Sequence, residues 1–317
     1  MGLERTLASF AVSTLLVMVV AACGADRLPE PRALGQASPS PGASLSPSPT
    51  ASISLSPTAS PSPSPTPSPR VIPHLFVIVM ENAGLNRALQ SRPIARLANG
   101  NTLLTNYYGV ARPSLPNYLA MTSGNTWGIT DNGYYVLPTR DLGTQLTTAG
   151  INWRAYMEGL TDAGCLRSPY PYSLKHNPFA YYGGKCPPNV VPMEALDVDL
   201  AGVTPSFLFI KPGLCNDGHD CALDVAGAWL EATVNRILMS EAWRAGGVMF
   251  VLWEEGEAGD NNLVPLIIIS KESPPRRVAT RYDHYSLLAT IEDHFGLPRL
   301  GAAATAQPLT PLFVPGR

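Results

Sequence analysis

Four short, nearly uninterrupted apolar stretches constrain the fold of this chain more than any other feature. They are residues 75–80 (LFVIVM), 206–210 (SFLFI), 248–253 (VMFVLW) and 264–269 (VPLIII). A strand in a parallel sheet is covered on both faces, so it is apolar throughout rather than at alternate positions. Segments with helical character lie between and after these runs, at residues 141–149, 224–240 and 284–295. The pattern predicts an α/β domain with a mostly parallel sheet sandwiched by helices.

Local signals define the helices and one long loop region. Asp224 is a suitable N-cap for the second helix, and Gly296, followed by Leu-Pro, is a suitable stop for the third. Residues 159–192 are rich in Tyr, Pro, Gly and Asn and are expected to form a long loop region. Long loops in small domains tend to carry function.

Acidic residues follow two of the predicted strands directly. Glu81 and Asn82 come after the first run, and Glu254 and Glu255 come after the third. In open α/β sheets, ligands bind outside the carboxyl ends of the strands. One acidic strand end is usually only solvated, but two at the same edge form a set of oxygen donors that suits a divalent cation.

Ser114, in the segment Arg-Pro-Ser-Leu-Pro-Asn-Tyr, stands just before a predicted helix start. A hydroxyl at this position lies in the positive field of a helix N-terminus, which favours an alkoxide and binds phosphate oxygens. The alternative is an ordinary serine N-cap. Three of the five histidines, His176, His219 and His284, lie in polar loops or at a helix start, where they can act as acids, ligands or phosphate donors.

The cysteines and the N-terminus both indicate export. Arg5, an apolar stretch at residues 7–20 and the sequence Ala-Ala-Cys23 describe a secretory signal that resembles a bacterial lipobox, with Cys23 as the lipidated residue. An uncleaved membrane anchor or a plain signal peptide are the alternatives. Four cysteines remain, which favours disulfides in an exported protein. The most local pairing is Cys165–Cys186 and Cys215–Cys221; a zinc site of Cys215, His219 and Cys221 is the alternative.

Composition divides the chain and excludes several functions. Residues 38–69 carry no charge, and 25 of these 32 positions are Pro, Ser or Thr, so the stretch cannot bury apolar area. We therefore expect a signal peptide at 1–22, a disordered stalk at 23–70 and one domain at 71–317. A net charge of −2 argues against a nucleic-acid binder, and no second apolar run is long enough for a polytopic membrane protein.

Taken together, these motifs resemble the bacterial phosphoesterase family of secreted acid phosphatases and phospholipases C, within the alkaline-phosphatase-like superfamily. The resemblance runs from His74 to about Leu309 and is strongest to the short acid-phosphatase members. It covers the Glu81-Asn82 strand end, the segment from Arg112 to Gly124, Lys-His176-Asn-Pro-Phe, Leu-Cys-Asn-Asp-Gly-His219-Asp-Cys, Trp-Glu-Glu255 and Asp-His284-Tyr.

The resemblance implies a role for each site residue. Metal ligands would be Glu81, Asn82, Ser114, Glu254 and Glu255, and Ser114 would also be the nucleophile that forms a phosphoserine. His176, His219 and His284 would contact the phosphoryl group, one of them as the acid for the leaving oxygen, and Arg112 and Asn117 would lie at the substrate. Protonated histidines would then favour an acidic pH optimum.

The chain departs from the family pattern at Glu254, where Asp is common, and at Arg112, where His is common. The substrate implied is a phosphorylated small molecule or lipid. Oxygen ligands favour Ca²⁺, Mg²⁺ or Mn²⁺, whereas the superfamily favours Zn²⁺. A phospholipase C-type phosphodiesterase and a non-catalytic cell-surface binding protein on the same fold are the alternatives.

Overall fold

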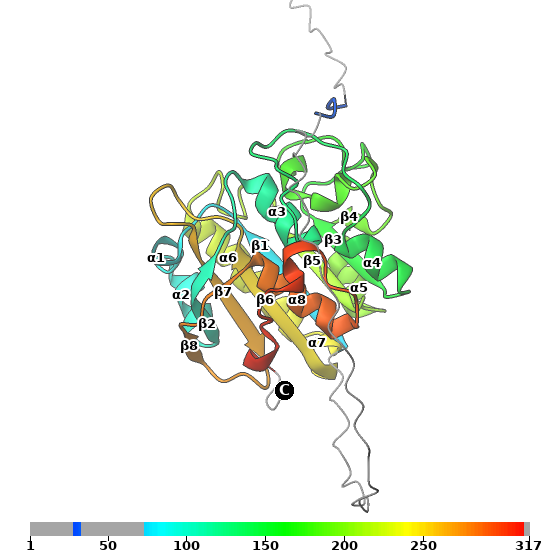
Figure 1. The fold of residues 1–317 in the computed structure, drawn as a ribbon. Coiled ribbons are helices and arrows are strands. Elements are labelled where there is room, and N and C mark those ends of the chain that lie inside the picture. Colours follow the sequence, from blue (N-terminus) through cyan, green and yellow to red (C-terminus); the bar gives the residue numbers. More distant parts are fainter. Residues whose placement is uncertain (1–27, 33–72, 314–317) are drawn as a thin grey trace, which may run out of the picture.

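The computed structural model describes residues 28–32 and 73–313, and its centre is one mixed sheet (Figure 1). The described strands are β1 (His74–Met80), β2 (Thr102–Tyr108), β3 (Trp153–Met157), β4 (Val190–Pro192), β5 (Phe207–Lys211), β6 (Gly247–Trp253), β7 (Leu263–Ser270), β8 (Arg276–Val278) and β9 (Tyr282–Asp283). Their order is β4-β3-β5-β1-β6-β7-β2-β8, with β9 also paired to β2. The four apolar runs are β1, β5, β6 and β7, as predicted.

Strand direction is parallel through most of the sheet. From β4 to β6 every neighbouring pair is parallel, and β7 runs antiparallel to both β6 and β2. Met80 is in register with Trp253 across the central β1–β6 pair. The residues that follow these two strands, Glu81 and Glu254, therefore leave the sheet at the same level.

Helices cover both faces of the sheet, since the central strands β1 and β6 are buried along nearly their whole length. The α-helices are α1 (Leu85–Ala88), α2 (Arg92–Asn99), α3 (Ser114–Ser123), α4 (Leu142–Thr148), α5 (Ala195–Ala201), α6 (Leu223–Leu238), α7 (Glu241–Gly246) and α8 (His284–Phe295). Helix α3 packs against α4 and α8, whereas α6 packs against α2 and α7. The predicted mostly parallel α/β sandwich is confirmed.

Two predicted helix starts differ in detail. The N-cap of α6 is Ala222, and Asp224 lies inside the first turn rather than at the cap. Ser114 is the first residue of α3, after Pro113 at the N-cap, so it does not cap the helix. In contrast, Asp283 caps α8 with a capping box, and Gly296 ends it in the left-handed conformation.

Both predicted disulfides are present, Cys165–Cys186 and Cys215–Cys221. The first ties down the region between β3 and β4, which contains the 3₁₀ helices η1 (Leu174–His176) and η2 (Pro178–Ala180). Two further 3₁₀ helices, η3 (Gly301–Ala304) and η4 (Thr310–Leu312), follow α8. The zinc site that the sequence left as an alternative is therefore wrong, because its two cysteines are joined to each other.

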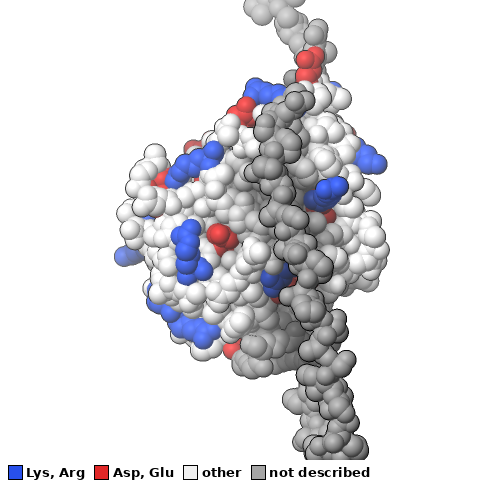
Figure 2. All heavy atoms as spheres, in the orientation of Figure 1, with Lys and Arg blue, Asp and Glu red and all other residues white. Residues whose placement is uncertain are grey.

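The predicted signal peptide, Cys23 and most of the predicted stalk lie outside the described residues. Within residues 28–32, Arg32 pairs with Asp131 and its backbone N–H donates to the Tyr134 carbonyl at 2.6 Å. This short part of the predicted stalk thus contacts the domain. Among the described helices, none has the length and apolar character that crossing a bilayer requires. On the face shown in Figure 2, Lys and Arg side chains stand apart from one another rather than in a cluster.

Candidate active site

The carboxyl edge of the sheet brings together the chain segments that carry the five predicted metal ligands. The Ser114 hydroxyl donates to Glu255 Oε1 at 3.0 Å. The backbone N–H of Asn82 donates to Glu254 Oε2 at 3.4 Å. Asn82 can turn the chain here because Asn tolerates the left-handed backbone, and its φ is 47°. Three chain segments, after β1, at the start of α3 and after β6, therefore meet at one place.

The carboxylates in this cluster are removed from water. Glu81 and Glu254 are completely buried, and Glu255 is 7% exposed. Burial and then the neighbouring Glu81 raise the pKa of Glu254 well above its ordinary value. Burial also raises the pKa of Glu255, although the Ser114 hydroxyl opposes the shift. Placing several acids together out of water is unfavourable unless a cation compensates them.

A cation fits this donor set. Glu81 Oε2 and Glu254 Oε1 are buried and have no hydrogen-bond partner among the described residues. Carboxylate oxygens of this kind are the ligands that hard divalent cations prefer. Two unpartnered oxygens on adjacent strand ends, beside the Ser114–Glu255 pair, thus form an oxygen-rich position of the kind that suits a metal ion.

A second group of donors overlaps the first at Glu81. In the described part of the chain, ligand atoms of Glu81, His176 and Asp217 lie within 4.8 Å of one another. His176 Nε2 is 3.3 Å from Glu81 Oε1, and His176 Nδ1 is 3.6 Å from Asp217 Oδ2. The family resemblance did not assign His176 or Asp217 as ligands.

Three residues of this network carried no predicted role: Tyr118, Lys211 and Asp217. The Tyr118 hydroxyl donates to Glu81 Oε1, and the Lys211 ammonium pairs with Asp217 Oδ2 at 2.5 Å. Burial raises the pKa of Asp217 to about 6, against the opposing effect of Lys211. Lys211 ends β5 directly after a buried run, which is the same signal that identified Glu81 and Glu254.

The histidines separate into different environments. Burial lowers the pKa of His176 to about 3, despite the neighbouring Glu81, so this ring is neutral. Burial opposes ionisation of Glu81, but its neighbours His176 and Lys211 hold its pKa below the ordinary value. The predicted acidic optimum therefore does not follow from a protonated His176.

His284 contacts the backbone carbonyl of Glu254 and the Tyr107 hydroxyl. Its Nε2 is 2.6 Å from the Glu254 carbonyl oxygen, which can only accept, so this nitrogen carries the proton. Its Nδ1 then accepts from the Tyr107 hydroxyl at 2.9 Å. Burial lowers the pKa of His284 to about 4. Both ring nitrogens are engaged, so the structure does not bring His284 to a phosphoryl group as predicted; the ring instead holds the end of β6.

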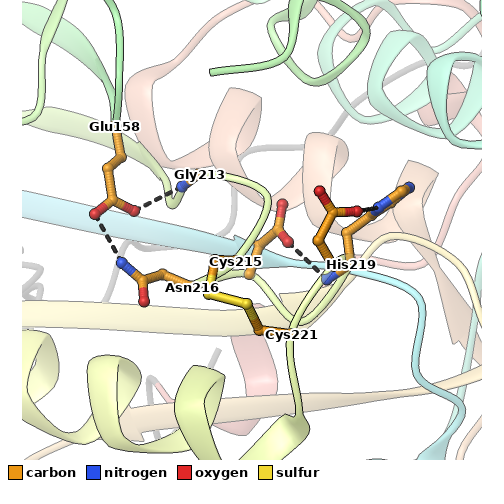
Figure 3. Close-up of a disulfide and its surroundings, with 8 residues drawn as sticks. Glu158, Gly213, Cys215, Asn216, His219 and Cys221 are labelled. Carbon is orange, nitrogen blue, oxygen red and sulfur yellow. Dashed lines mark hydrogen bonds and ion pairs between the residues drawn. A yellow bond between two sulfur atoms is a disulfide. The ribbon is translucent and has the colours of Figure 1, made fainter. Parts of the chain in front are cut away.

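His219 lies on the central loop closed by the Cys215–Cys221 disulfide (Figure 3). Glu158, which follows β3, anchors this loop by accepting from the Gly213 N–H at 2.7 Å and the Asn216 amide at 2.8 Å. The His219 N–H donates to Asp217 Oδ1 at 2.8 Å, which links the loop to the buried network. The side chain is partly exposed, and its ring centroid is 6.0 Å from that of His176.

The two predicted substrate-binding residues outside the histidines are held by the protein itself. Asn117 accepts from the N–H groups of Val110 and Ala111 at 2.9 Å each, and its amide donates to the carbonyls of Ala111 and Pro113. Its hydrogen-bonding capacity is thus used up in shaping the loop before Ser114, which does not fit the predicted contact with substrate.

Arg112 is half-exposed and binds the loop that follows Glu255. Its guanidinium donates to the carbonyls of Gly256 and Glu257 and to Asp260, and it lies 3.8 Å from Glu255 Oε2. The structure therefore brings Arg112 to the edge of the carboxylate cluster, with most of its donors directed to residues 256–260.

Comparisons with known proteins agree with the motifs. The model of the Phosphoesterase family matches residues 84–298. The phosphate-repressible acid phosphatase of Penicillium chrysogenum is 28% identical over 243 residues, which cover 71% of this chain and 59% of that protein. A phosphatidylinositol-3-phosphatase of Mycobacterium tuberculosis is 30% identical over 253 residues, with coverage of 76% and 82%. The chain spans less than two thirds of the length of the fungal acid phosphatase.

Solved structures share the fold at low sequence identity. A protein of the alkaline phosphatase superfamily from Vibrio parahaemolyticus has a TM-score of 0.56 at 12% identity, covering 76% of this chain and 70% of that one. The lipoteichoic acid synthase LtaP from Listeria monocytogenes has a TM-score of 0.51 at 10% identity, covering 75% and 74%. The predicted alkaline-phosphatase-like architecture is confirmed.

Proposed function

Because the chain belongs to the Phosphoesterase family, we propose that it hydrolyses phosphate monoesters with a divalent metal ion and Ser114 as the nucleophile. One observation carries this proposal. The Ser114 hydroxyl, at the first residue of α3, donates to Glu255 beside the buried carboxylates of Glu81 and Glu254. A structural serine has no need of such neighbours, whereas a nucleophile for phosphoryl transfer needs a nearby base and a nearby cation.

The metal ion would be held by the five residues at the carboxyl edge, Glu81, Asn82, Ser114, Glu254 and Glu255. When bound, it would lower the pKa of a hydroxyl and compensate negative charge on the phosphoryl oxygens. The unpartnered oxygens of Glu81 and Glu254 support this assignment. The Tyr118 hydroxyl donates to Glu81, and the Lys211 ammonium lies 3.8 Å from its Oε1, so both groups orient this carboxylate.

The protein's own residues account for the proton transfers. Ser114 Oγ attacks phosphorus while its proton passes to Glu255 Oε1, 3.0 Å away. The bond between phosphorus and the ester oxygen breaks, and that oxygen takes a proton from His219. A water molecule then attacks the phosphoserine and gives its proton to His219. The phosphorus–Oγ bond breaks, Glu255 returns the proton to Ser114, and inorganic phosphate leaves.

His219 suits the acid role better than the other two histidines. His176 and His284 are both buried, whereas the His219 side chain is partly exposed. Its Nδ1 is 2.6 Å from Asp220 Oδ1 and its Nε2 is 3.2 Å from the Lys175 ammonium, and these two contacts orient the ring. Its backbone bond to Asp217 keeps it next to the site.

The natural substrate is either a soluble phosphate monoester or a phosphorylated lipid head group at a surface. The Mycobacterium tuberculosis relative, named a phosphatidylinositol-3-phosphatase, supports the lipid class. We also propose that the chain is anchored outside the cytoplasm through lipidated Cys23, a position that the two disulfides support. Radiolabelled palmitate should enter the wild-type chain but not Cys23→Ser.

Ser114→Ala is the decisive variant for the mechanism. It should lose at least about three orders of magnitude in turnover of p-nitrophenyl phosphate, since the covalent path disappears. Stability should fall by only about 1.5–3 kcal/mol, the value of a hydrogen bond to a charged group. Ser123→Ala is the matched control, because Ser123 is a buried serine in the same helix that donates to the Leu119 carbonyl instead.

Acid quenching during turnover should trap phosphate on the peptide that contains Ser114, in wild type and in Ser123→Ala. Normal turnover by folded, metal-loaded Ser114→Ala would end the phosphoserine proposal. Parallel assays with p-nitrophenyl phosphate, a bis(p-nitrophenyl) phosphodiester and phosphatidylinositol 3-phosphate vesicles would separate a monoesterase from a phospholipase C-type activity. Absence of turnover with all three would favour a non-catalytic binding protein.

A further inference from the structure

Lys211 is a buried lysine in the middle of the candidate site, and it takes no part in the proposed proton transfers. It ends β5, beside β1 in the sheet, and its side chain is 3% exposed. Its ammonium lies 2.5 Å from Asp217 Oδ2 and 3.8 Å from Glu81 Oε1. A lysine is almost never this buried unless it is paired, and both of these carboxylates are completely buried.

The ammonium occupies a place that otherwise suits a metal ion. Glu81, His176 and Asp217 have ligand atoms within 4.8 Å of one another. A divalent cation bound by them would sit about 2.0–2.6 Å from the carboxylate oxygens. The Lys211 nitrogen is already at this distance from Asp217 Oδ2, so a metal ion and the ammonium cannot share the position.

We propose that Lys211 is a built-in cation that fills a second cation position formed by Glu81, His176 and Asp217, so that the site takes up one divalent ion. This inference rests on the proposed metal-dependent function. Lys211 is thus a positioning residue that sets the number of metal ions. A chelator removes a metal ion but not this ammonium. The arrangement of Glu81, His176 and Asp217 is therefore kept in the metal-free protein.

The test counts metal ions in a variant that lacks the ammonium. Lys211→Met keeps an unbranched side chain of similar length without the charge, and Lys175→Met, at a partly exposed lysine that contacts His219, is the matched control. Each protein is stripped with a chelator, equilibrated with Mn²⁺ and measured by mass spectrometry of the metal. Wild type and Lys175→Met should hold one ion per chain, and Lys211→Met should hold two.

Each other outcome has a distinct meaning. One ion in Lys211→Met, bound as tightly as in wild type, would overturn the inference and leave the proposed function intact. Two ions in wild type would overturn it as well. No ion in wild type would overturn the metal dependence itself, and the phosphoserine trap at Ser114 reports separately on the nucleophile.

A variant that fails to fold also decides the matter. Without the ammonium, Glu81 and Asp217 repel each other in a buried site, so metal-free Lys211→Met is expected to be destabilised. Added Mn²⁺ should then restore its thermal unfolding transition by filling the second position. The double variant Lys211→Met/Asp217→Asn removes the repulsion and should fold with one ion. Failure of Mn²⁺ to restore Lys211→Met, while the double variant folds, would show that the position accepts no metal.

Discussion

Tyr118→Phe isolates one hydrogen bond to a proposed metal ligand. The ring of Tyr118 is completely buried, and its hydroxyl donates to Glu81 Oε1. The variant removes one oxygen and keeps the packing of the ring, which stacks on His176 with centroids 5.3 Å apart. Glu81 retains His176 at 3.3 Å and Lys211 at 3.8 Å, so the variant removes only the contact with the Tyr118 hydroxyl.

The structure sets the expected size of two separate effects. The lost bond is made to a charged carboxylate, so unfolding should become easier by about 1.5–3 kcal/mol. Loss of a group that orients a metal ligand typically weakens metal affinity by about 10–100-fold. Urea unfolding of the metal-free protein measures the first effect, and calorimetric titration with Mn²⁺ measures the second.

Tyr156→Phe is a closely matched control. Tyr156, in β3, is also buried, and its hydroxyl donates to Asp199 Oδ2 at 2.6 Å, away from the carboxylate cluster. Its loss should lower stability by a comparable amount and leave Mn²⁺ affinity unchanged. The reasoning is refuted if Tyr118→Phe binds Mn²⁺ within about threefold of wild type, or if Tyr156→Phe weakens binding to the same extent.

Two further variants test the metal site and the pH dependence of stability. Glu254→Asp shortens a proposed ligand to the residue common in the family. Displacing a reacting group by about 1 Å can cost 100-fold in rate, so Mn²⁺ affinity or turnover should change at least tenfold. A change below twofold in both quantities would indicate that Glu254 is not a ligand. Burial raises the pKa of Glu292, in α8, to about 8 from 4.5, so the folded state holds this proton more tightly and its stabilising effect is lost as pH rises through this window. Glu292→Gln can still accept from the Leu300 N–H at 2.9 Å, so its melting temperature should fall less than that of wild type between pH 5 and pH 8; parallel curves would show that another group causes the pH dependence.

Much of the fold follows from local sequence. The buried strands are recognisable because a strand covered on both faces is apolar throughout, so it can be identified without knowing which strands it pairs with. The acids at the ends of β1 and β6 are adjacent in sequence to those runs, and the two disulfides join cysteines 21 and 6 positions apart. The direction of β7 could not be read in this way, because a strand buried on both faces is apolar whether it runs parallel or antiparallel to its neighbours.

The candidate site was only partly accessible to the same reasoning. The motif around Ser114 and the strand-end acids identify which residues meet, since the carboxyl ends of parallel strands share one edge. The positions of His284 and Asn117 in the chain did not reveal that other protein groups occupy their hydrogen-bonding atoms. Tyr107 and the Glu254 carbonyl bind the His284 ring, and the backbone of residues 110–113 binds the Asn117 side chain. These partners are far apart in sequence or depend on the exact path of a loop.

The sequence by itself therefore determined the α/β class, the edge of the sheet that carries the chemistry and the residue types available there. Only the tertiary structure decided which of those groups face one another. The register of β5 beside β1 brings Lys211 level with the end of the strand that precedes Glu81, and the central loop returns Asp217 to both. Charge and hydrogen bonding act over a few ångströms, so the ionisation and role of each buried group depend on neighbours that packing alone selects.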